Sequence, residues 1–340
     1  MNYVAPAWLP GGNLQTIWPA LYSRRVFGPH PQYRRERWDA PDGDFIDVDW
    51  LLNPTIASST ISPQRSLPQS KTLLVLFHGL EGSSRSHYAE AFADFAHEQS
   101  WAYAVPHFRG CSGELNRAPR AYHSGDFEEI GWILRCFKAK WAAQGGDDVL
   151  AIGVSLGGNA LLRWAEEAGD TAAQIVRAVA AVSSPLDLAA SGGAIGRGFN
   201  RLVYTRMFLQ SMKPRALQKL AQFPGLFDRE AMLSARDLYE FDNIVTAPLH
   251  GFSSTEDYWA RASAKPHLHR IRIPALAVNA RNDPFVPAWS LPDQQKVGQH
   301  VTLWQPAHGG HVGFPQGRIP GHVRGIPDAV GGWFCKVAGI

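Results

Sequence analysis

One serine in the chain has neighbours that favour nucleophilic chemistry. Residues 153–157 read Gly-Val-Ser-Leu-Gly, a G-x-S-x-G pattern with Ser155 at its centre. The pattern follows the apolar run 149–153 and precedes an amphipathic stretch, 156–168, so we expect a sharp turn between a strand and a helix. Such a turn projects the hydroxyl above the sheet, beside the positive end of the helix. An ordinary glycine-rich turn is the alternative interpretation.

A serine hydroxyl needs a general base and an orienting carboxylate, and candidates for both follow it in the chain. In proteins that carry a catalytic serine on such a turn, the acid follows the serine in the chain and the histidine follows the acid. Asp187 and Asp283 each follow an apolar run, and we favour Asp283, in the turn-rich loop 279–284, although either could merely cap a helix. His308 and His311 share the loop after the last apolar run. The residues alone leave both histidines open.

The histidine and cysteine positions give little support to a metal site, a cofactor or a disulfide. Glycines separate His308 from His311, and no carboxylate or cysteine stands near them as a third ligand, so we expect a turn and no metal. Cys111, Cys136 and Cys335 are an odd, widely spaced set without a C-x-x-C pattern. They suggest neither a disulfide framework nor a zinc site and fit a reducing compartment. We expect no cofactor.

Acyl transfer at Ser155 would also need two backbone N–H groups to stabilise the developing oxyanion. One should be the amide of Leu156, directly after the serine. The other should come from the loop 78–82, where we choose the amide of Leu80. His78, in the same loop, is interpreted as a buried histidine bonded to backbone.

Composition excludes several classes of protein. The chain has 340 residues, of which 45% are hydrophobic and 19% charged, which is unlike disordered or fibrous proteins. Its 33 basic and 30 acidic residues leave a net charge of +3, too balanced for nucleic-acid binding by the whole chain. The N-terminus lacks a signal-peptide pattern, and no apolar run approaches 18 residues. We therefore expect a soluble, cytoplasmic protein.

Short apolar runs alternate with amphipathic segments, which predicts an α/β fold with a mostly parallel sheet. The expected strands are 73–77, 101–105, 149–153, 175–182, 274–278 and 301–304. The expected helices are 88–100, 126–143, 156–168 and 326–337. Upstream, Tyr33 to Leu52 alternates around Pro41-Asp42-Gly43, which is typical of an antiparallel hairpin.

A long insertion separates the strands 175–182 and 274–278. Its segments 200–210 and 214–222 look helical, so we interpret residues 186–269 as a mostly helical cap. The expected domain division is a core of residues 1–185 and 270–340, with an N-terminal extension (1–32), a flexible Ser/Pro/Gln-rich loop (53–70) and the cap.

Seven motifs in order resemble a known family. They are Pro10–Ile17, His78–Ser84, Phe108–Gly113, Tyr122–Asp126, Ser155–Asn159, Asp283–Phe285 and Gly309–Phe314. Together they resemble the α/β-hydrolase fold, and more narrowly the YheT-like branch with the larger mammalian abhydrolase-domain lipases and esterases. The resemblance covers nearly the whole chain.

The resemblance implies a Ser155, Asp283, His311 triad and hydrolysis of carboxylic esters, with acylglycerols or phospholipids as substrates of relatives. It favours His311 over His308. Two departures stand out: Gly11-Gly12-Asn13 replaces the Asn-Gly-His that usually precedes Leu-Gln-Thr, and the His-x4-Asp acyltransferase signature of some relatives is absent. We therefore do not predict acyl transfer to lysolipids.

The leading hypothesis is thus a serine esterase acting on a small-molecule or lipid-like ester through an acyl-enzyme. A thioesterase or peptidase would use the same machinery, and a slow-turnover ligand-binding homologue could retain the triad. No feature of the sequence predicts an oligomeric state.

The cap carries an unusual charge pattern. Six basic residues and no acidic residue lie between Leu188 and Phe227: Arg197, Arg201, Arg206, Lys213, Arg215 and Lys219. Interleaved with apolar residues, they could contact an anionic membrane surface or a lipid headgroup. We prefer the simpler interpretation of a solvated helix face over an apolar core.

Overall fold

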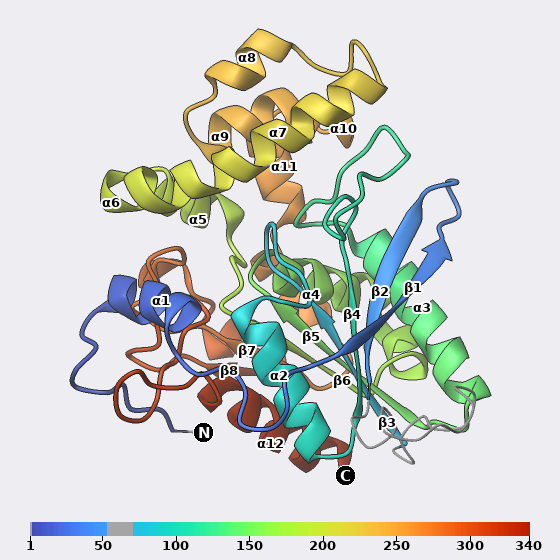
Figure 1. The fold of residues 1–340 in the computed structure, drawn as a ribbon, viewed down its shortest axis with the longest axis vertical. Coiled ribbons are helices and arrows are strands. Elements are labelled where there is room, and N and C mark those ends of the chain that lie inside the picture. Colours follow the sequence, from blue (N-terminus) through green and yellow to red (C-terminus); the bar gives the residue numbers. More distant parts are fainter. Residues whose placement is uncertain (1, 53–70) are drawn as a thin grey trace.

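Eight strands form one sheet in the order β1-β2-β4-β3-β5-β6-β7-β8 (Figure 1). The computed structural model describes residues 2–52 and 71–340, so the expected loop 53–70 lies outside the described residues. The strands are β1 Tyr33–Asp39, β2 Phe45–Leu51, β3 Thr72–Phe77, β4 Ala102–Pro106, β5 Asp148–Val154, β6 Ala178–Val182, β7 Ala275–Val278 and β8 Val301–Trp304. β2 pairs antiparallel with β1 and β4, and every other pairing is parallel. The predicted α/β class and parallel sheet are confirmed.

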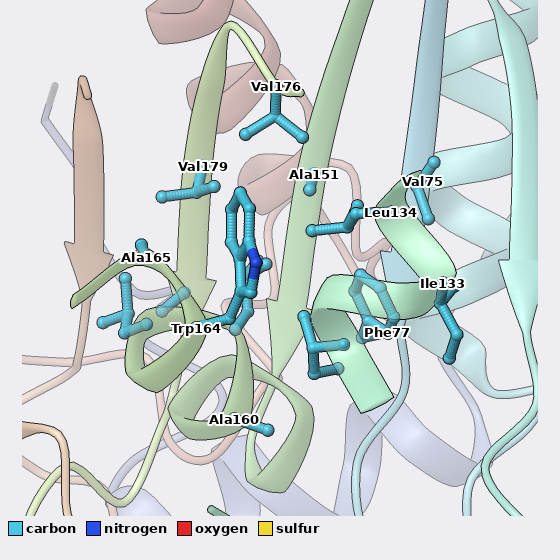
Figure 2. Close-up of a cluster of buried hydrophobic side chains, with 14 of the residues drawn as sticks. Val75, Phe77, Ile133, Leu134, Ala151, Ala160, Trp164, Ala165, Val176 and Val179 are labelled. Atoms are coloured by element: carbon cyan, nitrogen blue, oxygen red, sulfur yellow. The ribbon is translucent and has the colours of Figure 1, made fainter. Parts of the chain in front are cut away.

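Helices cover both faces of the sheet because its central strands are apolar on both faces. In β3, Leu73, Val75 and Phe77 join one core layer, while Leu74 and Leu76 join the other. The first layer is completed by α3 (Phe127–Ala143) and α4 (Leu156–Ala168), the second by α2 (His87–Glu98) and α12 (Gly325–Ala338). In Figure 2, Trp164 of α4 packs over the strands among Ala151, Val176 and Val179.

The predicted hairpin is confirmed as β1 and β2, paired from Tyr33 with Leu51 to Asp39 with Phe45. Its turn is closed by hydrogen bonds between Ala40 and Asp44, 2.8 Å, and from Gly43 N–H to Ala40 O, 3.0 Å. Gly43 has φ 79°, a conformation that glycine adopts without steric cost.

Between β6 and β7 the described chain is helical, and we call residues 186–269 the cap segment. In Figure 1 it lies above one end of the sheet, with its helices stacked on one another. Its elements are α5 Leu188–Ile195, α6 Gly198–Asn200, the π-helix η2 Arg201–Thr205, α7 Arg206–Gln222, α8 Arg229–Ser234, α9 Leu238–Phe241, the π-helix η3 Asp242–Thr246, α10 Ala247–Leu249, α11 Thr255–Ala262 and the 3₁₀ helix η4 Lys265–Arg270. Leu209, Met232, Phe241 and Val245 form a small core of its own.

The remaining elements lie outside the cap segment. They are α1 Gly12–Leu21 and the 3₁₀ helices η1 Gly169–Gln174, η5 Ala288–Ser290 and η6 Gln294–Lys296.

Two element predictions were wrong in detail. The strand expected from residue 175 begins at Ala178, because Ile175 and Val176 complete the turn after η1 and Val176 is buried from there. The break expected in the cap between residues 210 and 214 is absent, since α7 runs from Arg206 through Pro214 to Gln222, and residues 201–205 before it form the π-helix η2. Proline removes the hydrogen bond to the carbonyl of Gln210, but both residues are exposed, so water can satisfy that carbonyl.

Candidate active site

Ser155 occupies the turn between β5 and α4, where its backbone is strained. Its φ and ψ are 53° and −120°, a conformation that costs a non-glycine residue about 1–3 kcal/mol. The flanking glycines are required sterically: a Cβ on Gly157 would lie 2.4 Å from His78 O, and one on Gly153 would lie 2.4 Å from Gly157 O. The G-x-S-x-G pattern therefore lets α4 pack closely against the sheet with the serine at its N-terminus.

Three side chains from distant segments form one hydrogen-bonded chain. Nε2 of His311 lies 3.0 Å from Ser155 Oγ, and its Nδ1 lies 2.9 Å from Asp283 Oδ2. Asp283 and His311 follow β7 and β8, so parallel strands bring them to the same edge as Ser155. The other carboxylate oxygen, Oδ1, accepts the amides of Phe285 and Val286 at 2.8 and 3.3 Å. With Nδ1–H donated to Asp283, Nε2 accepts the serine hydroxyl proton.

The alternative candidates lie in other surroundings. Asp187 is the N-cap of α5, where it accepts the amide of Ala190 at 3.1 Å, and it pairs with Lys265 at 3.1 Å. His308 is exposed, and its Nδ1 lies 3.4 Å from the amide nitrogen of Asn282.

The loop after β3 presents one backbone amide without a protein acceptor. The N–H of Gly79 donates to the Tyr88 hydroxyl and that of Glu81 to the Tyr122 hydroxyl, both at 2.9 Å. The amide of Leu80, between them, has no acceptor among the described residues. Leu80 and Leu156 line the same cavity as Ser155. The two tyrosines thus hold the loop on both sides of the predicted oxyanion donor, a role that no local sequence signal indicates.

His78 has the structural role expected of it. Nε2 accepts the amide of Phe108 at 3.1 Å, which leaves Nδ1–H to donate to Gly79 O at 2.8 Å. Complete burial lowers the pKa of His78 to about 3, so the ring stays neutral. It fixes the start of the loop 78–82 against the loop after β4.

Helix α1 holds the loop that carries His311. Thr16 Oγ1 accepts the His311 amide at 2.8 Å and donates to Gly12 O at 2.7 Å. Oε1 of Gln15 accepts the amides of Gly309 and of the Asn282 side chain, both at 2.9 Å. These residues belong to the N-terminal motif of the resemblance, but their partners lie almost 300 positions away, and reasoning from the residues assigned them no role.

An apolar cavity of about 190 Å³ opens at Ser155, between the sheet and the cap segment. Leu188, Ile195, Phe208, Met212, Phe241 and Val245 are among its lining residues. Phe285 stacks beside the His311 ring, with centroids 4.1 Å apart. Nη1 of Arg215 in α7 donates to Glu81 Oε1 at 3.0 Å and so ties the cap segment to the loop 78–82.

Within residues 2–52 and 71–340, no three His, Cys, Asp or Glu side chains gather as metal ligands would. No helix in these ranges has the length and apolar character needed to cross a bilayer.

The model of the alpha/beta hydrolase fold matches residues 72–317, more than half of the chain and all three candidate catalytic residues. The chain belongs to the α/β-hydrolase fold family. A relative in Escherichia coli (strain K12), "Putative esterase YheT", is 40% identical over 311 residues, covering 90% of this chain and 85% of that protein. The mouse protein "Phospholipase ABHD3" is 28% identical over 293 residues, which are 86% of this chain and 69% of that protein.

Solved structures agree on the fold of this α/β hydrolase. Esterase Pf2001 of Pyrococcus furiosus superposes with a TM-score of 0.53 at 15% identity, over 92% of this chain and 98% of that one. The family resemblance stated from the motifs is therefore confirmed. At the N-terminal departure of this hydrolase, Asn13 accepts a hydrogen bond from the hydroxyl of Tyr204 in η2 at 2.9 Å, so α1 also contacts the cap segment.

Proposed function

We propose that this α/β hydrolase is a serine esterase that cleaves carboxylic esters through an acyl-enzyme. The observation that carries the proposal is the chain of hydrogen bonds from Ser155 Oγ through His311 to Asp283, at 3.0 and 2.9 Å. These hydrogen bonds begin at Ser155, beside a cavity whose lining is mostly apolar. Such a cavity suits an acyl group or another lipid-like part of a substrate.

In the first half-reaction, Ser155 Oγ attacks the ester carbonyl carbon while Nε2 of His311 takes the hydroxyl proton. The carbonyl electron pair moves to its oxygen, which the amides of Leu80 and Leu156 stabilise. The tetrahedral intermediate then expels the alkoxide, which receives the proton held on Nε2. Asp283 stays ionised and stabilises the imidazolium.

In the second half-reaction, water attacks the acyl group on Ser155 and gives its proton to His311. The new tetrahedral intermediate collapses, the serine oxygen recovers the proton, and the carboxylic acid leaves. Apart from the ester and the attacking water, both steps use groups of this chain alone.

A panel of p-nitrophenyl esters of graded acyl length tests both the nucleophile and the cavity. We expect kcat of Ser155→Ala to fall on the order of 10⁴- to 10⁶-fold. Ser191→Ala is the matched control, because Ser191 lines the same cavity and its hydroxyl has no partner among the described residues. Equal activity in wild type and Ser155→Ala would reject the proposal.

Labelling separates an esterase from a slow-turnover binding protein. A fluorophosphonate should modify Ser155 rapidly in the wild type and in Ser191→Ala, and not in Ser155→Ala. Ester hydrolysis should exceed one turnover per protein. Stoichiometric labelling without turnover would instead favour a binding protein that retains the nucleophile.

A further inference from the structure

The basic residues of the cap segment divide into two groups. Lys213, Arg215 and Lys219 donate hydrogen bonds to acceptors within the protein. Arg197, Arg201 and Arg206 are exposed and form no salt bridge among the described residues. Half of the positive charge therefore stabilises the fold, and the other half faces solvent at the start of the helical stretch 198–222.

Large apolar side chains are exposed on the same stretch. Phe199, Leu202 and Met207 are 52%, 73% and 51% exposed. A solvated helix face over an apolar core would turn such side chains inward, as Tyr204 and Leu209 are turned. The spacing of three to five residues across α6, η2 and α7 places Phe199, Leu202 and Met207 near one another on the outer face. The simpler interpretation preferred from the sequence does not explain this face.

A surface groove brings the exposed charges together. Its lining includes Arg201, Leu202, Arg206, Lys213 and Arg236. Lys213 is occupied by the carbonyls of Leu233 and Ala235. Arg236 is paired with Glu240, the acidic residue beside it, at 3.1 Å. Arg201 also feels the charge of Glu240 but forms no salt bridge with it, and Arg206 has no acidic partner among the described residues. Their guanidinium groups can therefore bind an anion from outside, next to the exposed Leu202.

Exposed apolar side chains also lie on and just after helix α1. Leu14 and Leu21 of α1 and Tyr22, directly after it, are exposed. Ile17 of α1 packs in the same small core as Tyr204 of η2, so the two elements adjoin. In Figure 1, α1 and α6 lie on the same side of the molecule.

We propose that this face, formed by α6, η2, the start of α7 and the neighbouring part of α1, docks onto an anionic lipid bilayer. Arg197, Arg201 and Arg206 would lie at the level of the lipid phosphates. Phe199, Leu202 and Met207 would enter the boundary between headgroups and acyl chains. A bilayer fits better than a soluble anion because the apolar and basic side chains share one exposed face. The proposal does not depend on the proposed esterase activity.

Sedimentation with vesicles tests the docking face. We use phosphatidylcholine vesicles with and without phosphatidylglycerol and expect salt-sensitive binding to the anionic vesicles only. Arg201→Glu/Arg206→Glu should weaken binding about 30-fold or more, the factor expected for two basic residues at an anionic surface. Leu202→Ser should weaken it about 10-fold through lost apolar burial.

The controls separate a docking face from general charge and from loss of fold. Arg34→Glu/Arg135→Glu makes the same charge change at two exposed positions outside the cap segment. This control variant should bind like wild type. All variants should keep wild-type melting temperatures and hydrolyse short, water-soluble esters normally, because Arg201, Arg206 and Leu202 do not line the Ser155 cavity. Equal loss in the control variant, unchanged binding by Leu202→Ser, or no vesicle binding by the wild type would overturn the proposal. An inactive enzyme that still binds vesicles would overturn only the esterase proposal.

Discussion

Replacing Thr16 by valine should impair catalysis from outside the active-site cavity. Thr16 Oγ1 accepts the His311 amide at 2.8 Å, and both residues are buried. Valine has nearly the shape of threonine but no hydroxyl, so the variant leaves that amide without its acceptor. Because the amide belongs to the candidate base itself, any movement that repairs the lost bond also moves the imidazole relative to Ser155.

The size of the effect follows from the cost of an unsatisfied amide. Leaving a buried N–H unpaired costs about 1–3 kcal/mol. If that cost appears in the transition state, kcat falls about 5- to 150-fold. KM should change little, because Thr16 does not line the substrate cavity. Thr16→Ser keeps the acceptor oxygen and should stay within about 3-fold of wild type.

The assay is steady-state hydrolysis of a p-nitrophenyl ester together with the rate of fluorophosphonate labelling at Ser155. Thr205→Val is the matched control: Thr205 is a buried threonine whose hydroxyl donates to Ile195 O at 2.9 Å, away from His311. Both valine variants should lose stability, but only Thr16→Val should lose kcat and labelling rate. If the two variants behave alike, Thr16 contributes to the fold and does not position the base.

Two further predictions concern stability. Burial lowers the pKa of His78 to about 3, against about 6.5 in the unfolded chain, so unfolding takes up a proton between these values. The free energy of unfolding should fall as pH falls from about 6.5 to 3, and His78→Gln should reduce the slope in urea titrations by up to about 1.4 kcal/mol per pH unit; an unchanged slope would contradict this. In α12, Gly331→Ala would place Cβ 1.9 Å from Phe95 Cζ, whereas Gly332→Ala meets open space. Denaturant unfolding should show a loss of about 1–3 kcal/mol for the first and a gain of about 0.5–1 kcal/mol for the second; effects of equal sign would refute the packing argument.

The sheet was predictable because its central strands are short apolar runs bounded by turn residues. Helix α4 was predicted to the residue, since Ser155 begins it and Gly169 ends it. The errors arose where local pattern and tertiary contacts disagree. Ile175 and Val176 have the apolar character of a strand but lie in the turn after η1, where Val176 is buried and Ile175 partly buried. Pro214 reads as a helix boundary, yet an exposed helix face tolerates it.

In the candidate site, too, some residues could be predicted from local sequence and others could not. The serine could be predicted from a local pattern, because a strand, a strained turn and a helix N-terminus are adjacent in sequence. The choice of Asp283 over Asp187 rested on chain order and on the turn-rich loop 279–284, whereas the choice of His311 over His308 needed the family resemblance. The contacts of Tyr88 and Tyr122 could not be predicted, because they join segments that only the fold brings together.

The contacts of helix α1 explain how a loop can hold the proposed catalytic base, His311. Ser155 is fixed by the elements on both sides of it, β5 and α4. His311 lies in a long stretch of turns between β8 and α12, and such loops are mobile unless their backbone is tied down. Here α1 supplies the ties, and it approaches so closely that a Cβ on Gly313 would lie 1.7 Å from Gln15 O. An N-terminal helix thus does for the histidine what α4 does for the serine, so damage to α1 should reduce catalysis before it unfolds the sheet.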